Sequence, residues 1–182
     1  MKSITNLASR PVGIPVIADE ILELHAARLL LLLQLCGTRN KIDGLTKLAK
    51  LDFFVRYPQF FNQICVRLGV SASAKTKSVE SAMVRFHYGP WDQRYYHLLA
   101  YLEGKGLLSV RRDANAYTFE LTERGKSAAS VLASNSSFTD MVAQMRSVKS
   151  VLGKKTGSAL KKLIYQVFQD EVTNRPIGEV IG

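Results

Sequence analysis

The chain has 182 residues, of which 47% are hydrophobic and 22% are charged, and its formal net charge at pH 7 is +10. This length and composition are typical of one globular domain and exclude an intrinsically disordered chain. The surplus of Lys and Arg favours encounters with polyanions. Nucleic acid is the commonest partner of this kind, while acidic protein surfaces and anionic lipid remain alternatives.

Three features indicate the compartment. Cys36 and Cys65 lie in apolar stretches without CxxC spacing, which predicts buried, reduced thiols in a reducing compartment. The apolar run 29–33 is far shorter than the roughly 18 residues that a membrane span needs. The first residues also lack the pattern of a secretory signal. We therefore expect a cytoplasmic protein that does not enter a membrane.

The first part of the chain predicts an extended arm followed by a central helix. Residues 1–17 mix Ser, Asn, Pro and Gly without periodicity, and Pro11 and Pro15 oppose a helix. Asp19 can cap a helix that continues through Cys36 and ends in the turn 37–40. Because this helix is apolar nearly all round after its first turns, we expect it at the centre of the fold.

A second helix is predicted over residues 44–58, where Pro58 stops it. It has two apolar faces and leads into a cluster of aromatic residues. Such a cluster is more often core than contact surface. A helix with two apolar faces nevertheless needs two covers, and one of them can be a partner chain. The candidate protein-interface residues in this region are Phe53, Tyr57, Phe60 and Phe61.

The middle of the chain predicts a strand, a helix and a hairpin in succession. Residues 83–88 alternate as a short strand that Gly89 and Pro90 end, and residues 91–102 have one apolar helical face. Strands over 107–112 and 117–121 then flank a tight turn. This succession is similar to the end of a winged-helix domain, where a recognition helix is followed by a hairpin called the wing.

The last part of the chain predicts two striped helices. They pack either on their own domain or on another chain, and Met141 and Met145 are candidate interface residues. Residues 146–162 hold six basic and no acidic side chains, which predicts an anion-facing surface or a solvated face. The fold class is therefore mainly α with a small β-hairpin, a winged-helix-like domain with N- and C-terminal helical extensions. Its parts are an extended arm (1–17), the winged-helix-like domain (18–134) and a C-terminal helical extension (135–182).

Catalytic motifs are absent from the sequence. His25, His87 and His97 are scattered, and neither a metal-ligand spacing, a phosphate-binding loop nor a nucleophile motif occurs. We therefore expect no enzyme activity, no metal and no cofactor.

Basic side chains on the predicted helix and wing, and in the C-terminal helices, are the candidate DNA contacts. A conventional winged helix has a short helix directly before the recognition helix, whereas a strand is predicted there in this chain. That difference disfavours sequence-specific reading of bases but not contact with phosphates. The candidate DNA-binding residues are Arg94, His97, Arg111, Arg112, Arg146, Lys149, Lys154 and Lys155.

Two blocks of sequence resemble a known family. They are GLTKLAKLDFFVRYP (44–58) and the segment 80–108, in which YGPWD (88–92) is the most distinctive piece. They are similar to the middle component of bacterial ABC-three-component systems, the group that includes Lamassu anti-phage defence. The resemblance covers about residues 19–133. It implies a non-catalytic accessory subunit that joins an SMC/Rad50-like ATPase to an effector, often a nuclease, and meets double-stranded DNA through the complex.

Two other functions remain open. A stand-alone winged-helix transcription regulator would bind its own promoter as a dimer, and would lose affinity when Arg94 and His97 are replaced by Ala. An antitoxin-like binder would be encoded beside a gene whose product is toxic alone.

Overall fold

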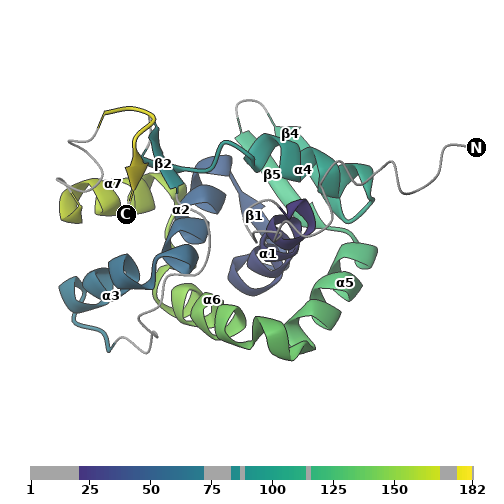
Figure 1. Cartoon of the computed structure of the whole chain (residues 1–182), viewed down its shortest axis with the longest axis horizontal. Helices are drawn as coiled ribbons and strands as arrows, with labels where there is room; N and C mark the ends of the chain where they lie inside the picture. The colour runs from purple at the N-terminus through teal and green to yellow at the C-terminus, as the bar shows by residue number, and fades with distance from the viewer. Residues whose placement is uncertain (1–20, 72–82, 87–88, 114–115, 169–175, 182) are drawn as a thin grey trace, which may run out of the picture.

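The computed structural model describes residues 21–71, 83–86, 89–113, 116–168 and 176–181. This part of the chain is mainly helical, with seven α-helices and two small antiparallel sheets (Figure 1). The predicted arm 1–17 lies outside it. In chain order the elements are α1 (Leu22–Cys36), β1 (Lys41–Asp43), α2 (Leu45–Arg56), α3 (Pro58–Arg67), β2 (Met83–Phe86), β3 (Gly89–Trp91), α4 (Tyr95–Gly104), β4 (Leu108–Asp113), β5 (Ala116–Leu121), α5 (Glu123–Ser134), α6 (Thr139–Leu152), α7 (Gly157–Val167) and β6 (Val180–Ile181).

Helix α1 is central, as its apolar sequence predicts. Leu29 to Leu33 are all buried, and α1 contacts α2, α4, α5, α6 and the first sheet. Figure 1 shows α2, α6 and α5 arranged around it. A leucine that is fully removed from water stabilises the fold by about 2 kcal/mol before the entropy of ordering is subtracted. This run therefore makes α1 the helix on which the others pack.

The first sheet has the strand order β1-β5-β4, and its β4–β5 hairpin confirms the predicted one. The third strand, β1, was not predicted. Its register places Ile42 opposite Phe119 and Lys41 opposite Glu120. Since neighbouring residues of a strand point to opposite faces, one face of the sheet buries Ile42 and Phe119, and the other presents Lys41 and Glu120 outward.

The second sheet has the order β3-β2-β6 and corrects the predicted strand and helix boundaries. Gly89 and Pro90 do not end the strand but belong to β3, which returns alongside β2. Gly89 has a φ of 91°, which glycine adopts without strain, and proline is tolerated in so short an edge strand. Trp91, predicted to start the helix, is the last residue of β3, and α4 begins at Tyr95.

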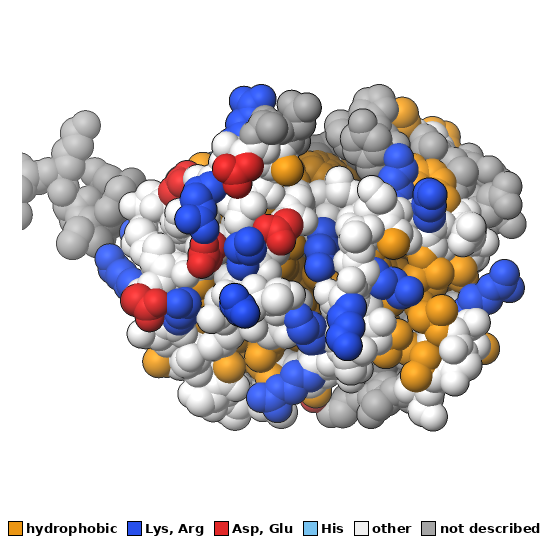
Figure 2. Space-filling model, turned by 180° about the vertical axis from the view of Figure 1, so that it is seen from behind, with side chains coloured by type: hydrophobic (Ala, Val, Ile, Leu, Met, Phe, Trp, Pro, Cys, Tyr) orange, Lys and Arg blue, Asp and Glu red, His pale blue; other side chains and the backbone are white. Residues whose placement is uncertain are grey.

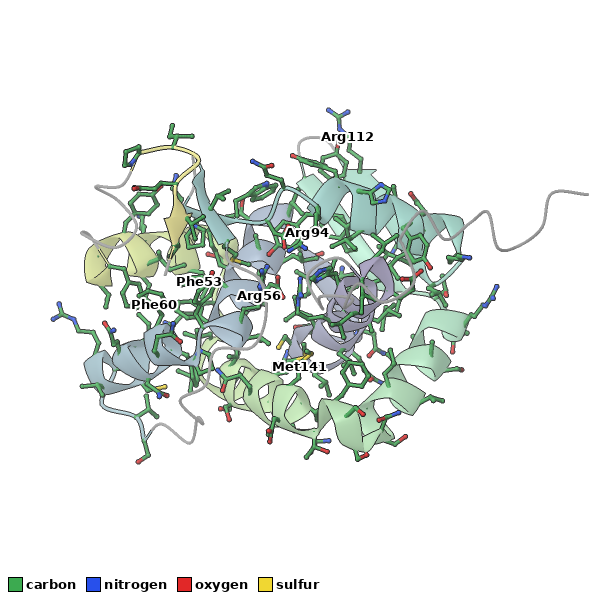
Figure 3. All side chains as sticks on the ribbon, viewed as in Figure 1. Phe53, Arg56, Phe60, Arg94, Arg112 and Met141 are labelled. Atoms are coloured by element: carbon green, nitrogen blue, oxygen red, sulfur yellow. The ribbon has the colours of Figure 1, made fainter. Side chains whose placement is uncertain are left out.

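The aromatic residues after α2 form core and not a partner-binding surface. Helix α2 ends before Pro58, as predicted, and Pro58 also begins α3, because proline suits the first position of a helix. The ring of Phe60 lies 5.3 Å from that of Phe53 and 4.8 Å from that of Phe168 (Figure 3). The second apolar face of α2 is thus covered by α3 and the end of α7. All four predicted interface residues here are at most 4% exposed: Phe53, Tyr57, Phe60 and Phe61.

The C-terminal helices pack into the same core. Met141 and Met145, predicted as interface residues, are buried, and the Cys36 thiol of α1 donates a hydrogen bond to the Met145 carbonyl at 3.3 Å. Burial raises the pKa of that thiol to about 12. The predicted extension 135–182 therefore shares its core with the domain before it.

A buried network of charges ties α1, α2 and the start of α4 together. Arg28 of α1 donates to Asp52 of α2 at 2.9 Å, and the Tyr95 hydroxyl donates to the same carboxylate at 2.7 Å. Arg56 donates to Asp92 at 2.8 Å. Burial would raise the pKa of Asp92, but hydrogen bonds from Arg94 and the charges of Arg56 and Arg94 hold it well below its usual value.

Two more polar side chains of α2 and its end bind the backbone of the second sheet. The Lys50 ammonium donates to the Pro90 carbonyl at 2.8 Å, and the Tyr57 hydroxyl accepts from the Met83 amide at 2.6 Å. The same hydroxyl donates to the Ile181 carbonyl at 3.0 Å. Polar residues of the first sequence block, 44–58, therefore hold the second block in place. The two blocks that carry the resemblance form one structural unit.

Replacing Asp92 with Asn is expected to destabilise the fold by about 3 kcal/mol. The amide keeps the shape but removes the negative charge that the buried Arg56 guanidinium requires. Chemical denaturation measures the change. Glu123→Gln is the matched control, because its partner Lys126 is at the surface and that substitution should change stability little. Equal effects of the two substitutions would contradict the role of the network.

Stability is expected to rise with pH because of Lys50. Burial, with the charge of Lys161, lowers the pKa of this ammonium from 10.5 to about 7. Between these values the unfolded chain binds more protons than the folded one, so the free energy of unfolding increases as pH rises. Between pH 7 and pH 9 the free energy of unfolding of the wild type should rise by about 2 kcal/mol relative to that of Lys50→Met. A difference in free energy of unfolding that stays constant with pH would contradict this prediction.

Candidate nucleic-acid interface

Arg94, predicted to read bases from the recognition helix, is held inside the charge network. Its Nε and Nη2 donate to the Asp92 carboxylate at 2.9 and 2.8 Å, and its Nη1 lies 2.8 Å from Nε2 of His25. Figure 3 shows it beside Arg56 near the middle of the molecule. Arg94 therefore fixes the start of α4. His97, the other predicted contact on this helix, is exposed, as is its neighbour Tyr96.

The two wing arginines are exposed but lie on opposite faces of the hairpin. Arg111 is opposite Thr118 in the register and pairs with Glu120 on the outer face. Arg112 is opposite Tyr117 and its guanidinium lies 5.8 Å from the centre of that ring. Figure 3 shows Arg112 pointing away from the body of the protein. The predicted pair of wing contacts is therefore split between two surfaces.

Lys149 has a structural role that sequence reasoning missed. Its ammonium donates to the Cys36 carbonyl at 3.0 Å and to the Gly37 carbonyl, so it satisfies the end of α1, where the helix dipole favours a cation. The remaining predicted basic residues of this region lie nearer to solvent. Arg146 and Lys154 are exposed, and Lys155 is half-buried.

The outer face of the first sheet forms a groove with the turn that follows α1. The groove has a volume of about 490 Å³, and it is lined by Thr38, Arg39, Lys41, Asp43, Arg111 and Glu120. Sequence analysis did not select Arg39 or Lys41. They come beside the wing only because the three-residue strand β1 pairs with β5. The sequence signal for strand β1 was the turn at residues 38–40 followed by the alternation of polar Lys41, apolar Ile42 and polar Asp43.

Basic residues of the C-terminal helices lie near the groove, since the Lys149 ammonium binds the carbonyl of Gly37, which directly precedes Thr38 of the lining. Lys47 of α2 is close to both groups: burial and the charge of Lys149 lower its pKa, while Asp43 of the groove opposes the shift. At Gly157, the start of α7, a Cβ atom would lie 3.0 Å from the Lys47 backbone nitrogen. The α6–α7 turn therefore lies next to Lys47. We name the resulting surface the basic face: Arg39, Lys41, Lys47, Arg111, Lys149, Lys154 and Lys155.

The charge on the face of the protein seen in Figure 2 is unevenly distributed. Figure 2 shows Lys and Arg side chains across the whole view, whereas Asp and Glu side chains gather mainly in its left half. Residues 141–168, which cover α6 after its first two residues and all of α7, contain no Asp or Glu, while Asp140 lies in the first turn of α6. Cations in such a stretch produce a positive field that extends about 8 Å into physiological salt. In the groove, by contrast, Asp43 and Glu120 lie among the cations. The arrangement is suited to contact with a polyanion.

Within the ranges described above, no cluster of three or more His, Cys, Asp or Glu side chains could hold a metal ion. None of the helices described there combines the length and apolar character required to cross a membrane. Comparisons with protein-family models, curated proteins and solved structures gave no match to the chain.

Proposed function

We propose that this protein is a non-catalytic accessory subunit with a winged-helix core, which contacts double-stranded DNA through the basic face. The observation that carries the proposal is that four separate segments bearing cations lie next to one another. These segments are the turn after α1 with β1, the start of α2, strand β4, and the end of α6 with the following turn. Phosphates of a nucleic-acid backbone are the ligand that such a surface favours.

The order of the elements supports a winged helix. In that fold a helix, a short strand and a second helix precede the recognition helix and the wing, and the short strand pairs with the second strand of the wing. The elements α1, β1, α2, α4, β4 and β5 follow this order, with sheet order β1-β5-β4. Helix α3 and the β2–β3 hairpin then form an insertion between α2 and α4.

The proposed contact with DNA is independent of sequence. Arg94 is committed to Asp92, and the exposed positions of α4 include Tyr96, His97 and Ala100 but no Lys or Arg. Reading of guanine most often uses Arg or Lys in the major groove. These observations favour a phosphate-binding subunit over a transcription regulator.

We place the subunit in a defence complex of the Lamassu type because of the two sequence blocks. Their polar residues Lys50, Asp52 and Asp92 bond within the chain, which supports a structural role for these blocks. In such a complex the subunit would join an SMC/Rad50-like ATPase to an effector nuclease.

Co-expression tests the proposed assembly. The chain should co-purify, in a stable complex, with the ATPase encoded beside it, and size-exclusion chromatography with light scattering measures the stoichiometry. Asp92→Asn provides a second readout, because misplacing α4 should weaken the complex as well as the fold. A folded protein that never associates with the ATPase would contradict the proposal.

DNA binding should fall with salt and ignore sequence. Unrelated duplexes should bind with equal affinity, and the affinity should decrease steeply between about 50 and 200 mM salt. Replacing Lys154 and Lys155 with Gln should weaken all duplexes about tenfold and reduce the salt slope by about two. Fluorescence anisotropy measures both. A strong preference for the protein's own promoter would instead support the regulator.

A further inference from the structure

The turn between α1 and β1 holds an arginine in an unfavourable backbone conformation. Arg39 and Asn40 have φ values of 54° and 60°, in the left-handed region. Asn tolerates that region, whereas a side chain such as Arg costs roughly 1 kcal/mol there. Strain of this kind persists only where the surrounding structure imposes it, and it is concentrated at functional sites.

The surroundings of the turn impose this conformation. The Thr38 amide donates to the Lys41 carbonyl at 2.8 Å, and the Lys41 amide donates back at 3.2 Å. The Asn40 carbonyl accepts from the Leu121 amide of β5 at 3.1 Å. Gly37 allows the chain to approach so closely, since a Cβ atom there would lie 2.2 Å from the Leu33 carbonyl oxygen. The turn is therefore fixed to both α1 and the wing.

Arg39 differs from the other two cations of the groove in its partners. Lys41 lies 3.3 Å from Asp43, and Arg111 pairs with Glu120, so the two carboxylates are each matched by one cation. Within the part of the chain that the structure describes, no hydrogen bond or ion pair engages the Arg39 side chain, which is exposed. The groove thus has one positive charge that its own carboxylates leave uncompensated.

We infer that this groove binds a phosphate of the DNA backbone, and that Arg39 is the residue that contacts it. The inference rests on the proposed function and assigns one of its contacts. Arg suits this role because its planar guanidinium donates two parallel hydrogen bonds to a phosphate. The groove is open at the surface, and the Lys149 ammonium binds the carbonyl of Gly37, the residue before Thr38 of its lining.

The same geometry gives Lys149 a positioning role. Its ammonium binds the Gly37 carbonyl, directly before the turn, and so fixes the end of α1 from which Arg39 projects. The sequence predicted that Lys149 contacts DNA. In the structure Lys149 holds the turn that carries the proposed contact, Arg39.

Arg39→Asn tests the inference in the full-length chain. Asn removes the charge and keeps the left-handed conformation, so the turn should be retained. Affinity for a short fluorescein-labelled DNA duplex should fall about fivefold, and the slope of log affinity against log salt should decrease by about one. Arg124→Gln is the control, because it removes an equal charge from an exposed site on α5 outside the groove. It should change the affinity less than twofold.

One further variant and one ligand complete the test. Arg39→Lys keeps the charge and should preserve the salt slope. Circular dichroism should show that no variant melts below the wild type, and Arg39→Asn should melt slightly higher because Asn tolerates the left-handed conformation. Equal binding by Arg39→Asn and Arg124→Gln would overturn the inference while leaving the proposed function intact. A wild-type protein that binds no duplex would overturn both. If Arg39→Asn weakened binding only to an RNA duplex of the same sequence and not to the DNA duplex, the assignment to DNA would be overturned.

Discussion

The ion pair between Arg56 of α2 and Asp92, in the segment between β3 and α4, joins two residues 36 positions apart in the sequence, and the placement of α4 and the β4–β5 hairpin depends on it. Both groups are almost completely removed from water, so removing either charge weakens the compensation of the other in the core. Arg28, Asp52 and Tyr95 extend the same constraint to α1. Since these bonds need α1, α2 and the β3–α4 segment in place together, they favour one arrangement of the three over all others.

This use of charge inside the protein changes what the net charge of +10 means. Arg28, Lys50, Arg56, Arg94 and Lys149 all bind groups of the chain itself, so they contribute less to the surface than their number suggests. The cations that remain outside lie on turns, strands and helices that the internal network holds in register. Fold and surface charge are therefore coupled: the buried charges position the exposed ones.

The parts of the fold that sequence predicts are those with local signals. The apolar run of α1, the stop at Pro58 and the alternating strands of the wing each arise from residues close together in the chain. The parts that sequence misses depend on distant partners. Strand β1 is recognisable only when Ile42 lies opposite Phe119, and the aromatic face of α2 is core because Phe168 covers Phe60. The candidate site follows the same division: Arg111, which lines the groove, was predicted from the local pattern of the hairpin, whereas Arg39 was not, because its groove requires β1.

Cys36 supplies an internal reporter of opening motions. At neutral pH a thiol with a pKa near 12 contains almost no reactive thiolate, and this one is also shielded by α6. Alkylating reagents can modify it only when the centre of the protein opens. Cys65, on α3, is likewise buried and its pKa is raised by burial. The two modification rates therefore give separate free energies for opening of α1 and of α3, without any engineered label.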